Sequence, residues 1–147
     1  MMQVFPSHAW FQAVREVYNG DASLHSGGGG ACDTTAGLKV GDDGYLIVFE
    51  GLECADIRPA GEDEMSEADF IIEMPLALWK EMVANVQENG KADLDHTLNS
   101  IDLQQEESIA YSPADDQYRQ DLFYRYNQNF QDFFDASSRV ETIFDQA

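Results

Sequence analysis

The sequence predicts an α+β fold in which helices cover a mostly antiparallel sheet of about four to five strands. Three observations lead to this prediction: an amphipathic stretch at residues 7–20, short apolar runs between turn signals at 31–73, and helical spacing of apolar residues at 76–88 and 118–134. A chain of 147 residues has the usual length of one domain. We therefore expect a single domain over residues 1–147.

The first helix is predicted between Ser7, a good N-cap residue, and Asn19-Gly20, a good C-terminal signal. Its apolar residues recur at spacings that place them on one face: Trp10, Phe11, Val14, Val17 and Tyr18. Four glycines then occupy residues 27–30. Because no Lys-Ser or Lys-Thr pair follows them and the next residues favour a strand, they predict a flexible loop and not a phosphate-binding loop.

Several short strands are predicted after this loop. The first lies within residues 31–40 and is followed by a turn at Asp42-Asp43-Gly44. The second, Tyr45–Phe49, is apolar on both faces, which predicts that both faces are covered. The third lies around Glu53–Arg58, and the polar residues Pro59–Ser66 are expected to form a loop. Short turns between successive strands favour an antiparallel meander.

The most regular stretch is residues 67–86, in which a strand is followed directly by a helix. Phe70–Glu73 is the predicted strand, and Met74-Pro75 interrupts it. From Leu76 to Glu88 the apolar residues follow helical spacing. Proline is tolerated in the first turn of a helix, because its missing N–H would have no partner there. Asn89-Gly90 is the expected end of this helix.

A long aromatic helix is predicted near the C-terminus. Residues 91–103 favour a short helix or turn, and Tyr111-Ser112-Pro113 is a break before the long helix. The apolar stripe of that helix consists of Tyr118, Leu122, Phe123, Tyr126, Phe130, Phe133 and Phe134. The apolar residues beyond it are expected to continue the helix or to form a short last turn: Val140, Ile143 and Phe144.

The charge of the chain excludes some partners. Eight Lys and Arg oppose 28 Asp and Glu, which gives a net charge of −20. Nucleic-acid binding depends on neutralising phosphates, and anionic membranes attract basic segments, so we expect neither as a partner. The N-terminal residues lack the regions of a signal peptide, and no apolar run reaches the roughly 18–20 residues of a membrane span. We expect no stable membrane insertion and a cytoplasmic location.

No group of residues has the spacing of a known metal site. Cys32 and Cys54 are not part of a CxxC pair, so reduced thiols are expected instead of zinc ligands. Asp93, Asp95 and His96 lack a second histidine at the spacing of helical zinc motifs, and we interpret them as caps and solvated acids. No metal and no cofactor is expected.

No catalytic signature is recognisable either. His8 and His25 can titrate near neutral pH, but neither has a neighbouring nucleophile in the sequence. Glu73 is the most interesting acid, because an inward position would raise its pKa by burial and make it a candidate base or ligand-binding group. Alternation along the strand places Glu73 on the face opposite Phe70 and Ile72, so we expect its carboxylate to face solvent. We therefore predict no catalytic residue.

The bulk of the aromatic side chains leaves two interpretations of the space between sheet and helices. The two layers could pack as a solid core, or they could enclose an elongated apolar pocket. In the second case the sheet would contribute one face and the helices its roof, and the predicted ligand-binding residues are Leu46, Val48, Phe70, Ile72, Trp79, Met82, Phe123, Tyr126, Phe130 and Phe134.

A family resemblance rests on short motifs in residues 68–90: Ala68-Asp69-Phe70-Ile71-Ile72-Glu73, Leu78-Trp79-Lys80-Glu81-Met82 and Asn89-Gly90. Together with the strand-like runs 44–49 and 51–58 before them, they resemble the sterol carrier protein 2 (SCP2-like) family over residues 7–90. The part after Gly90 diverges from the family's further strand and lipid-facing C-terminal helix. The resemblance implies helices over a mostly antiparallel sheet and a non-enzymatic hydrophobic tunnel for sterol-like, fatty-acyl or other lipid molecules.

The expected function is therefore binding or transfer of a lipid or other small apolar ligand, without catalysis. Two alternatives remain open from the sequence. One is an enzyme or binder on a cone-shaped fold of the nuclear transport factor 2 type, although such a fold places its helices first and this chain ends in helix. The other is an interaction module in which the aromatic helix packs a solid core or forms a homodimer interface.

Overall fold

A computed structural model describes residues 2–20, 33–51, 53–104 and 109–144. Cys32, His25 and the glycines at 27–30 lie outside these ranges. The elements, in chain order, are β1 (Gln3–Phe5), α1 (His8–Gly20), β2 (Thr34–Val40), β3 (Asp43–Glu50), β4 (Glu53–Pro59), α2 (Glu62–Met65), β5 (Phe70–Met74), α3 (Leu76–Asn89), α4 (Leu98–Gln104), β6 (Ala110–Tyr111), α5 (Gln117–Asp135), the 3₁₀ helix η2 (Ala136–Arg139) and β7 (Thr142–Phe144).

The main sheet has five strands in the order β4-β3-β2-β5-β6. β2, β3 and β4 form the predicted antiparallel meander. β5 then lies parallel to β2, on the side away from β3, and β6 pairs antiparallel with β5. The prediction of a mostly antiparallel sheet within an α+β fold is thus confirmed. The last strand of this sheet is Ala110–Tyr111, although Tyr111 was predicted only as the start of a break.

The turn between β2 and β3 lies one residue earlier than predicted. Val40 pairs with Asp43, so the connection consists of Gly41 and Asp42. Gly41 has a φ of 65°, in the left-handed region that glycine adopts without steric cost. The glycine that the turn requires is therefore Gly41 and not the predicted Gly44, which is already part of β3.

The predicted transition from strand to helix is confirmed. β5 ends at Met74, Pro75 is the N-cap of α3, and Gly90 ends the helix with a φ of 82°. The indole of Trp79 donates a hydrogen bond of 2.8 Å to the carbonyl of Lys39, which ties the first turn of α3 to β2. Asp69 fixes the other end of β5, because its carboxylate accepts from the hydroxyl of Thr34 at 2.7 Å.

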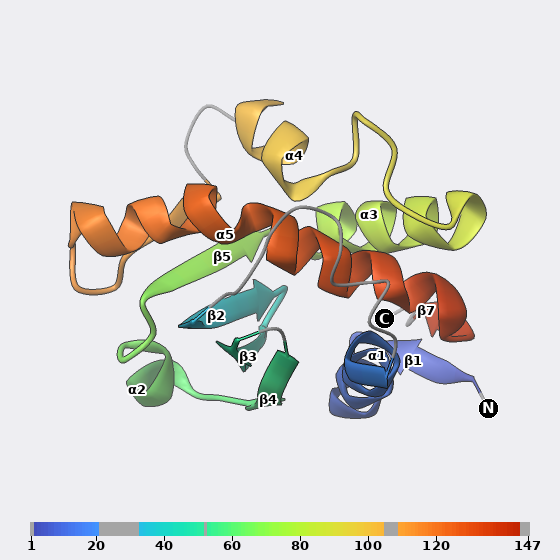
Figure 1. Cartoon of the computed structure of the whole chain (residues 1–147), viewed down its shortest axis with the longest axis horizontal. Coiled ribbons are helices and arrows are strands. Elements are labelled where there is room, and N and C mark those ends of the chain that lie inside the picture. Colours follow the sequence, from blue (N-terminus) through green and yellow to red (C-terminus); the bar gives the residue numbers. More distant parts are fainter. Residues whose placement is uncertain (1, 21–32, 52, 105–108, 145–147) are drawn as a thin grey trace.

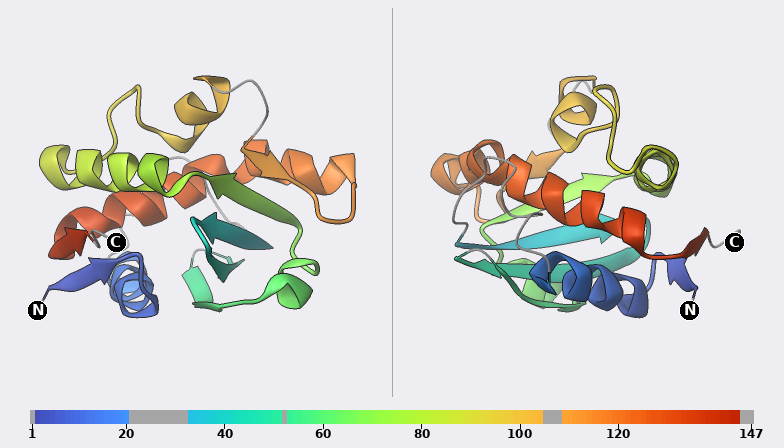
Figure 2. Two further views of the ribbon diagram at one scale, coloured as in Figure 1. Left: turned by 180° about the vertical axis from the view of Figure 1, so that it is seen from behind. Right: turned by 45° about the vertical axis from the view of Figure 1, so that its right-hand side comes forward.

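Helices cover one face of the sheet. Figures 1 and 2 show α3 and α5 lying across the same side of the sheet, α4 on their outer side and α1 beside β4. The apolar side chains of this face and of the helices form the main core, in which the largest fully buried members are Trp10, Trp79, Tyr18, Phe5, Phe11, Phe49, Phe70, Phe123, Phe130, Phe133, Phe134 and Leu38. Tyr118, predicted as part of the helical stripe, is 71% exposed because the first turn of α5 extends beyond this core.

The opposite face of the sheet carries a second, smaller core. Leu46 and Ile71 pack there with Met65 and Ala68. Met65 belongs to α2, which lies within the segment predicted to be only a polar loop. β3 is therefore covered on both faces around Leu46, as its sequence predicted, but by a single helical turn on this side.

The two ends of the chain meet in a separate parallel pair. β1 pairs with β7, with Phe5 opposite Phe144. The indole of Trp10 donates a hydrogen bond of 3.0 Å to the hydroxyl of Thr142 in β7. The prediction that residues 140–144 continue the helix or form a short turn is wrong, because the backbone becomes extended at Val140, after η2, and pairs with the N-terminal strand. Within the described ranges, no helix has the length and apolar character needed to cross a bilayer.

Candidate functional site

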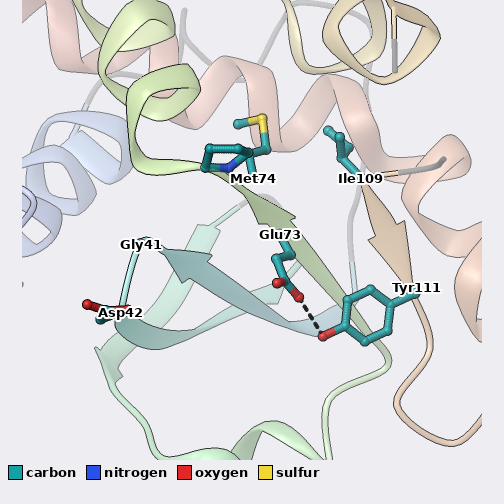
Figure 3. A pocket seen from close by; sticks show the side chains of 7 residues that line it. Gly41, Asp42, Glu73, Met74, Ile109 and Tyr111 are labelled. Atoms are coloured by element: carbon teal, nitrogen blue, oxygen red, sulfur yellow. Dashed lines mark hydrogen bonds between the residues drawn. The ribbon is translucent and has the colours of Figure 1, made fainter. Parts of the chain in front are cut away.

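A pocket with a volume of about 540 Å³ opens where β5 leads into α3 (Figure 3). Its volume lies within the range of roughly 300–1,000 Å³ that is usual for small-molecule sites. Three segments that are distant in sequence contribute its lining: the turn after β2, the end of β5, and the residues around β6. The lining residues are Gly41, Asp42, Glu73, Met74, Pro75, Ile109 and Tyr111.

Sheet pairing brings these segments together. Lys39 of β2 lies opposite Glu73 of β5, which places the β2–β3 turn next to the end of β5. The amide of Glu73 donates to the carbonyl of Ile109 at 2.8 Å, and the amide of Ile109 donates to a buried carboxylate oxygen of Asp102 at 2.8 Å. The backbone on both sides of the pocket is thus held by hydrogen bonds, so the pocket shape depends on the fold and not on one mobile side chain.

Part of the pocket lining is apolar. Met74 and Ile109 belong to this part, and both are buried members of the main core between sheet and helices. Their exposed fractions are only 3% and 5%. These two residues connect the pocket lining with the apolar core that α3 and α5 cover.

The outer part of the pocket is polar. The hydroxyl of Tyr111 donates a hydrogen bond of 2.9 Å to Oε1 of Glu73, and Figure 3 shows the two side chains pointing toward one another. The ammonium of Lys39 lies 3.7 Å from the same Oε1 and 5.8 Å from the centre of the Tyr111 ring. Glu73 is exposed, as its position in the strand predicted.

Lys39 and Tyr111 both keep their protons at neutral pH. The Tyr111 hydroxyl raises the pKa of Lys39, against the opposing effect of desolvation. Burial raises the pKa of Tyr111 against the opposing effect of the Lys39 ammonium, and the bond to Glu73 also raises it. Near pH 7 Lys39 is therefore a protonated ammonium without a lone pair, and Tyr111 is a neutral phenol without the negative charge of an activated nucleophile.

The ten residues predicted to bind a ligand do not all lie on one side of the sheet. Leu46 and Ile71 both pair with Gly37, and both side chains lie in the small core on the face away from α3 and α5. Phe70 and Ile72 lie in the main core on the helical face. Grouping Leu46 and Val48 with Phe70 and Ile72 on one sheet face is wrong, because β3 is apolar on both faces and alternation alone does not show which residues face the helices.

The other eight predicted residues meet in the main core. Seven of them are fully buried, and Tyr126 packs against their edge. Their rings are in direct contact: the centroids of Phe70 and Phe130 are 5.5 Å apart and those of Trp79 and Phe134 are 5.6 Å apart. These edge-to-face and tilted contacts are those of a packed aromatic core. That the eight residues line a ligand pocket stays a prediction.

The other candidate residues have structural surroundings. His96 shares a hydrogen bond of 2.7 Å with Asp93 and lies 3.5 Å from Glu81, and the contact with Asp93 raises the pKa of His96. Asp93 also accepts from the backbone amide of Asp95, as an acid at a turn does. In the ranges that the structure describes, no group of three or more His, Cys, Asp or Glu is arranged to hold a metal ion.

Of the two cysteines, Cys54 lies within the described residues, and its side chain in β4 is fully buried. Burial raises its pKa to about 12. A thiol with such a pKa is almost entirely protonated at neutral pH and is a poor nucleophile. Cys54 is therefore part of the core and not of a reactive site.

Sequence reasoning singled out Glu73 but missed the residues around it. Lys39 reaches Glu73 only because β5 lies parallel to β2, and a simple meander would have placed β5 elsewhere. Ile109 and Tyr111 belong to a segment around a two-residue strand that has no recognisable apolar pattern of its own. The sequence did contain one indication for Lys39: alternation along β2 puts it on the face opposite Leu38 and Val40.

Two solved structures share this fold. A conserved hypothetical protein from Thermus thermophilus, suggested to be a sterol carrier protein, matches with a TM-score of 0.62 and 18% identity over 97% of this chain and 93% of its own. A crystal structure of sterol carrier protein 2 matches with a TM-score of 0.54 and 19% identity over 91% of this chain and 97% of its own. No protein-family model and no curated protein matches the sequence. The fold is thus SCP2-like, and the cone-shaped alternative is not the one adopted.

Proposed function

We propose that this chain binds, and passes on unchanged, a small lipid-like apolar ligand. The proposed binding site is the pocket between β5 and the segment around β6. The observation that carries the proposal is its lining, which combines two core residues, Met74 and Ile109, with the hydrogen-bonded polar pair Glu73 and Tyr111. An apolar cavity with a few convergent polar groups is the common form of a small-molecule site.

Two further observations support this function. The fold is that of the two solved structures described above, which are a sterol carrier protein and a protein suggested to be one. The pocket also adjoins the aromatic core predicted from the sequence to face a ligand. We place the ligand's polar end at the rim and its apolar end against Met74, Pro75 and Ile109. The eight predicted residues of the main core, among them Phe70, would then lie behind Met74 and Ile109.

The chemistry of the rim supports binding without reaction. Lys39 and Tyr111 both keep their protons at neutral pH, because the pKa of each is raised. A site without a deprotonated lysine or a phenolate can orient a ligand by hydrogen bonds but offers no activated nucleophile. The chain is therefore proposed to be a carrier and not an enzyme.

Uptake of Nile red, a neutral dye that fluoresces in apolar surroundings, tests the proposal. The wild-type protein should give a saturable rise in fluorescence, and native mass spectrometry of protein purified from cells should show a bound lipid mass. Asp42→Trp, at an exposed position of the pocket rim, should weaken dye binding about tenfold by filling the entrance. Asp121→Trp on the exposed side of α5 is the matched control and should bind the dye normally.

The two readouts together decide the proposal. Wild-type protein that carries no lipid mass and takes up no dye would overturn it. Dye that binds equally to the wild type and to Asp42→Trp would also contradict the proposed site, since the ligand would then lie elsewhere in the molecule.

A further inference from the structure

The charged groups in the pocket lining are all acidic. Asp42 and Glu73 carry the formal negative charges there, and no lysine, arginine or histidine of the described residues lines it. The adjoining hollow shares Asp42 and Glu73 with the pocket and adds Asp43 and Glu62, with Lys39 as the basic residue among its described lining. A carboxylate, phosphate or sulfate head group would meet like charge at this entrance, in a chain of net charge −20.

Lys39 does not reverse this balance. Its ammonium lies 3.7 Å from Oε1 of Glu73 and close to the ring of Tyr111, so its positive charge is already paired with the Glu73 carboxylate. An anionic ligand would have to draw Lys39 away from Glu73 and would leave that carboxylate without its cation. The bound anion would therefore replace one ion pair with another and would still face Asp42.

Glu73 has room for a donor from a ligand. Both contacts of its carboxylate that the structure shows, from Tyr111 and from Lys39, reach Oε1. An ionised carboxylate has about four lone-pair sites on two oxygens, so Oε2 can accept further hydrogen bonds. The exposed position of Glu73 at the pocket rim leaves this oxygen within reach of a head group whose tail lies against Met74 and Ile109.

From these observations we infer that the pocket selects amphiphiles whose head group donates hydrogen bonds and carries no negative charge. An ammonium head is the best match, a hydroxyl head is second, and a carboxylate is the poorest. This inference rests on the proposed function, because it names the class of ligand for the same pocket. It assigns Glu73 as the residue that determines head-group specificity and Met74 and Ile109 as the surface that holds the chain.

Displacement of Nile red by decylamine, decanol and decanoate at neutral pH tests the inference, since these ligands share one alkyl chain length and differ in the head. Decylamine should displace the dye at about one-tenth of the concentration needed for decanoate, with decanol between them. Glu73→Gln keeps an acceptor for Tyr111 and removes the charge, so it should reduce the preference for the amine about fivefold. Asp121→Asn removes one exposed charge outside the pocket lining and should keep the wild-type order.

Each outcome has a distinct meaning. If decanoate displaces the dye as well as decylamine does, the inferred selectivity is wrong and the proposed carrier function stands. If Glu73→Gln and Asp121→Asn behave alike, the preference comes from the overall charge and the role of Glu73 is refuted. If Nile red does not bind to the wild type at all, the proposed function itself fails.

Discussion

Asp135, the last residue of α5, has a partly buried carboxylate. The side chain accepts hydrogen bonds from the amide of Ala92 at 3.0 Å and from the amide group of Gln131 at 2.9 Å. Burial nevertheless raises the pKa of Asp135, and these bonds only reduce the effect. The folded state thus binds a proton at this site more tightly than the unfolded state, so ionisation of Asp135 costs stability.

Replacing Asp135 with Asn should remove this cost. The favourable contribution of the protonated acid is complete below the unfolded pKa and is lost as pH rises through the folded pKa. Asp135→Asn should therefore be more stable than the wild type at pH 7, by about 0.5 kcal/mol, and the difference should shrink as pH falls. Urea denaturation at several pH values measures it. Asp121→Asn, at an exposed position on the same helix, is the control, and an equal gain there would contradict the explanation.

At the scale of single elements, α1 protects the edge of the sheet. β4 is an outer strand, and side chains of α1 bond to its outward-facing backbone. Arg15 donates to the carbonyls of Cys54 at 2.9 Å and Ala55 at 2.8 Å, and Asn19 both donates to and accepts from the backbone of Cys54. An edge strand with satisfied backbone groups is a poor template for pairing with another chain.

Removing Arg15 tests this role. Arg15→Ala takes away the side-chain donor that reaches two carbonyls of β4 and should lower the free energy of unfolding by about 1–2 kcal/mol. It should also increase association at high protein concentration, which light scattering detects. Arg119→Ala is the control, because the guanidinium of Arg119 forms an exposed contact of 3.8 Å with Asp116, and its loss should cost less than about 0.5 kcal/mol. Equal effects in the two variants would count against edge protection.

Gly44 fixes the approach of β3 to the end of β4. A Cβ at this position would lie 2.8 Å from the carbonyl oxygen of Ala60, and that backbone is held by the bond from its amide to the carbonyl of Gly44. Gly44→Ala should therefore destabilise the fold by about 1–3 kcal/mol, as measured by thermal denaturation. Among the residues that the structure describes, a Cβ on Gly20 would meet no atom within 4 Å beyond its chain neighbours and its own helix backbone, so Gly20→Ala should be neutral or slightly stabilising. A neutral Gly44→Ala would show that the strands can separate without cost.

Local elements were predictable and long-range pairings were not. The sequence of α3 contains its own periodicity and its own end at Gly90, and α5 likewise shows its aromatic stripe. The parallel position of β5 beside β2 depends on a crossover that no local pattern encodes. This pairing brings Lys39 beside Glu73, which lines the pocket, so the sequence pointed to one acid of the site but not to the residues around it.

At the scale of the whole molecule, the net charge of −20 opposes the compact state. Cations screen this self-repulsion, because the Debye length falls from about 30 Å at 0.01 M salt to about 8 Å at 0.15 M. The melting temperature should therefore rise with added NaCl, most steeply over this range. Near pH 4.1, where the net charge vanishes, the salt effect should disappear. A melting temperature independent of salt at pH 7 would contradict this account.

The most direct measurement of the central claim is a methyl NMR titration of the protein with decanol. Met74 lines the pocket, whereas Met82 is fully buried within the aromatic core between α3 and the sheet. We predict a saturable shift of the Met74 methyl signal, accompanied by that of Ile109, with little change at Met82. A shift confined to Met82, or no saturable shift at the methyl groups of these three residues, would contradict the assignment of a ligand to this pocket.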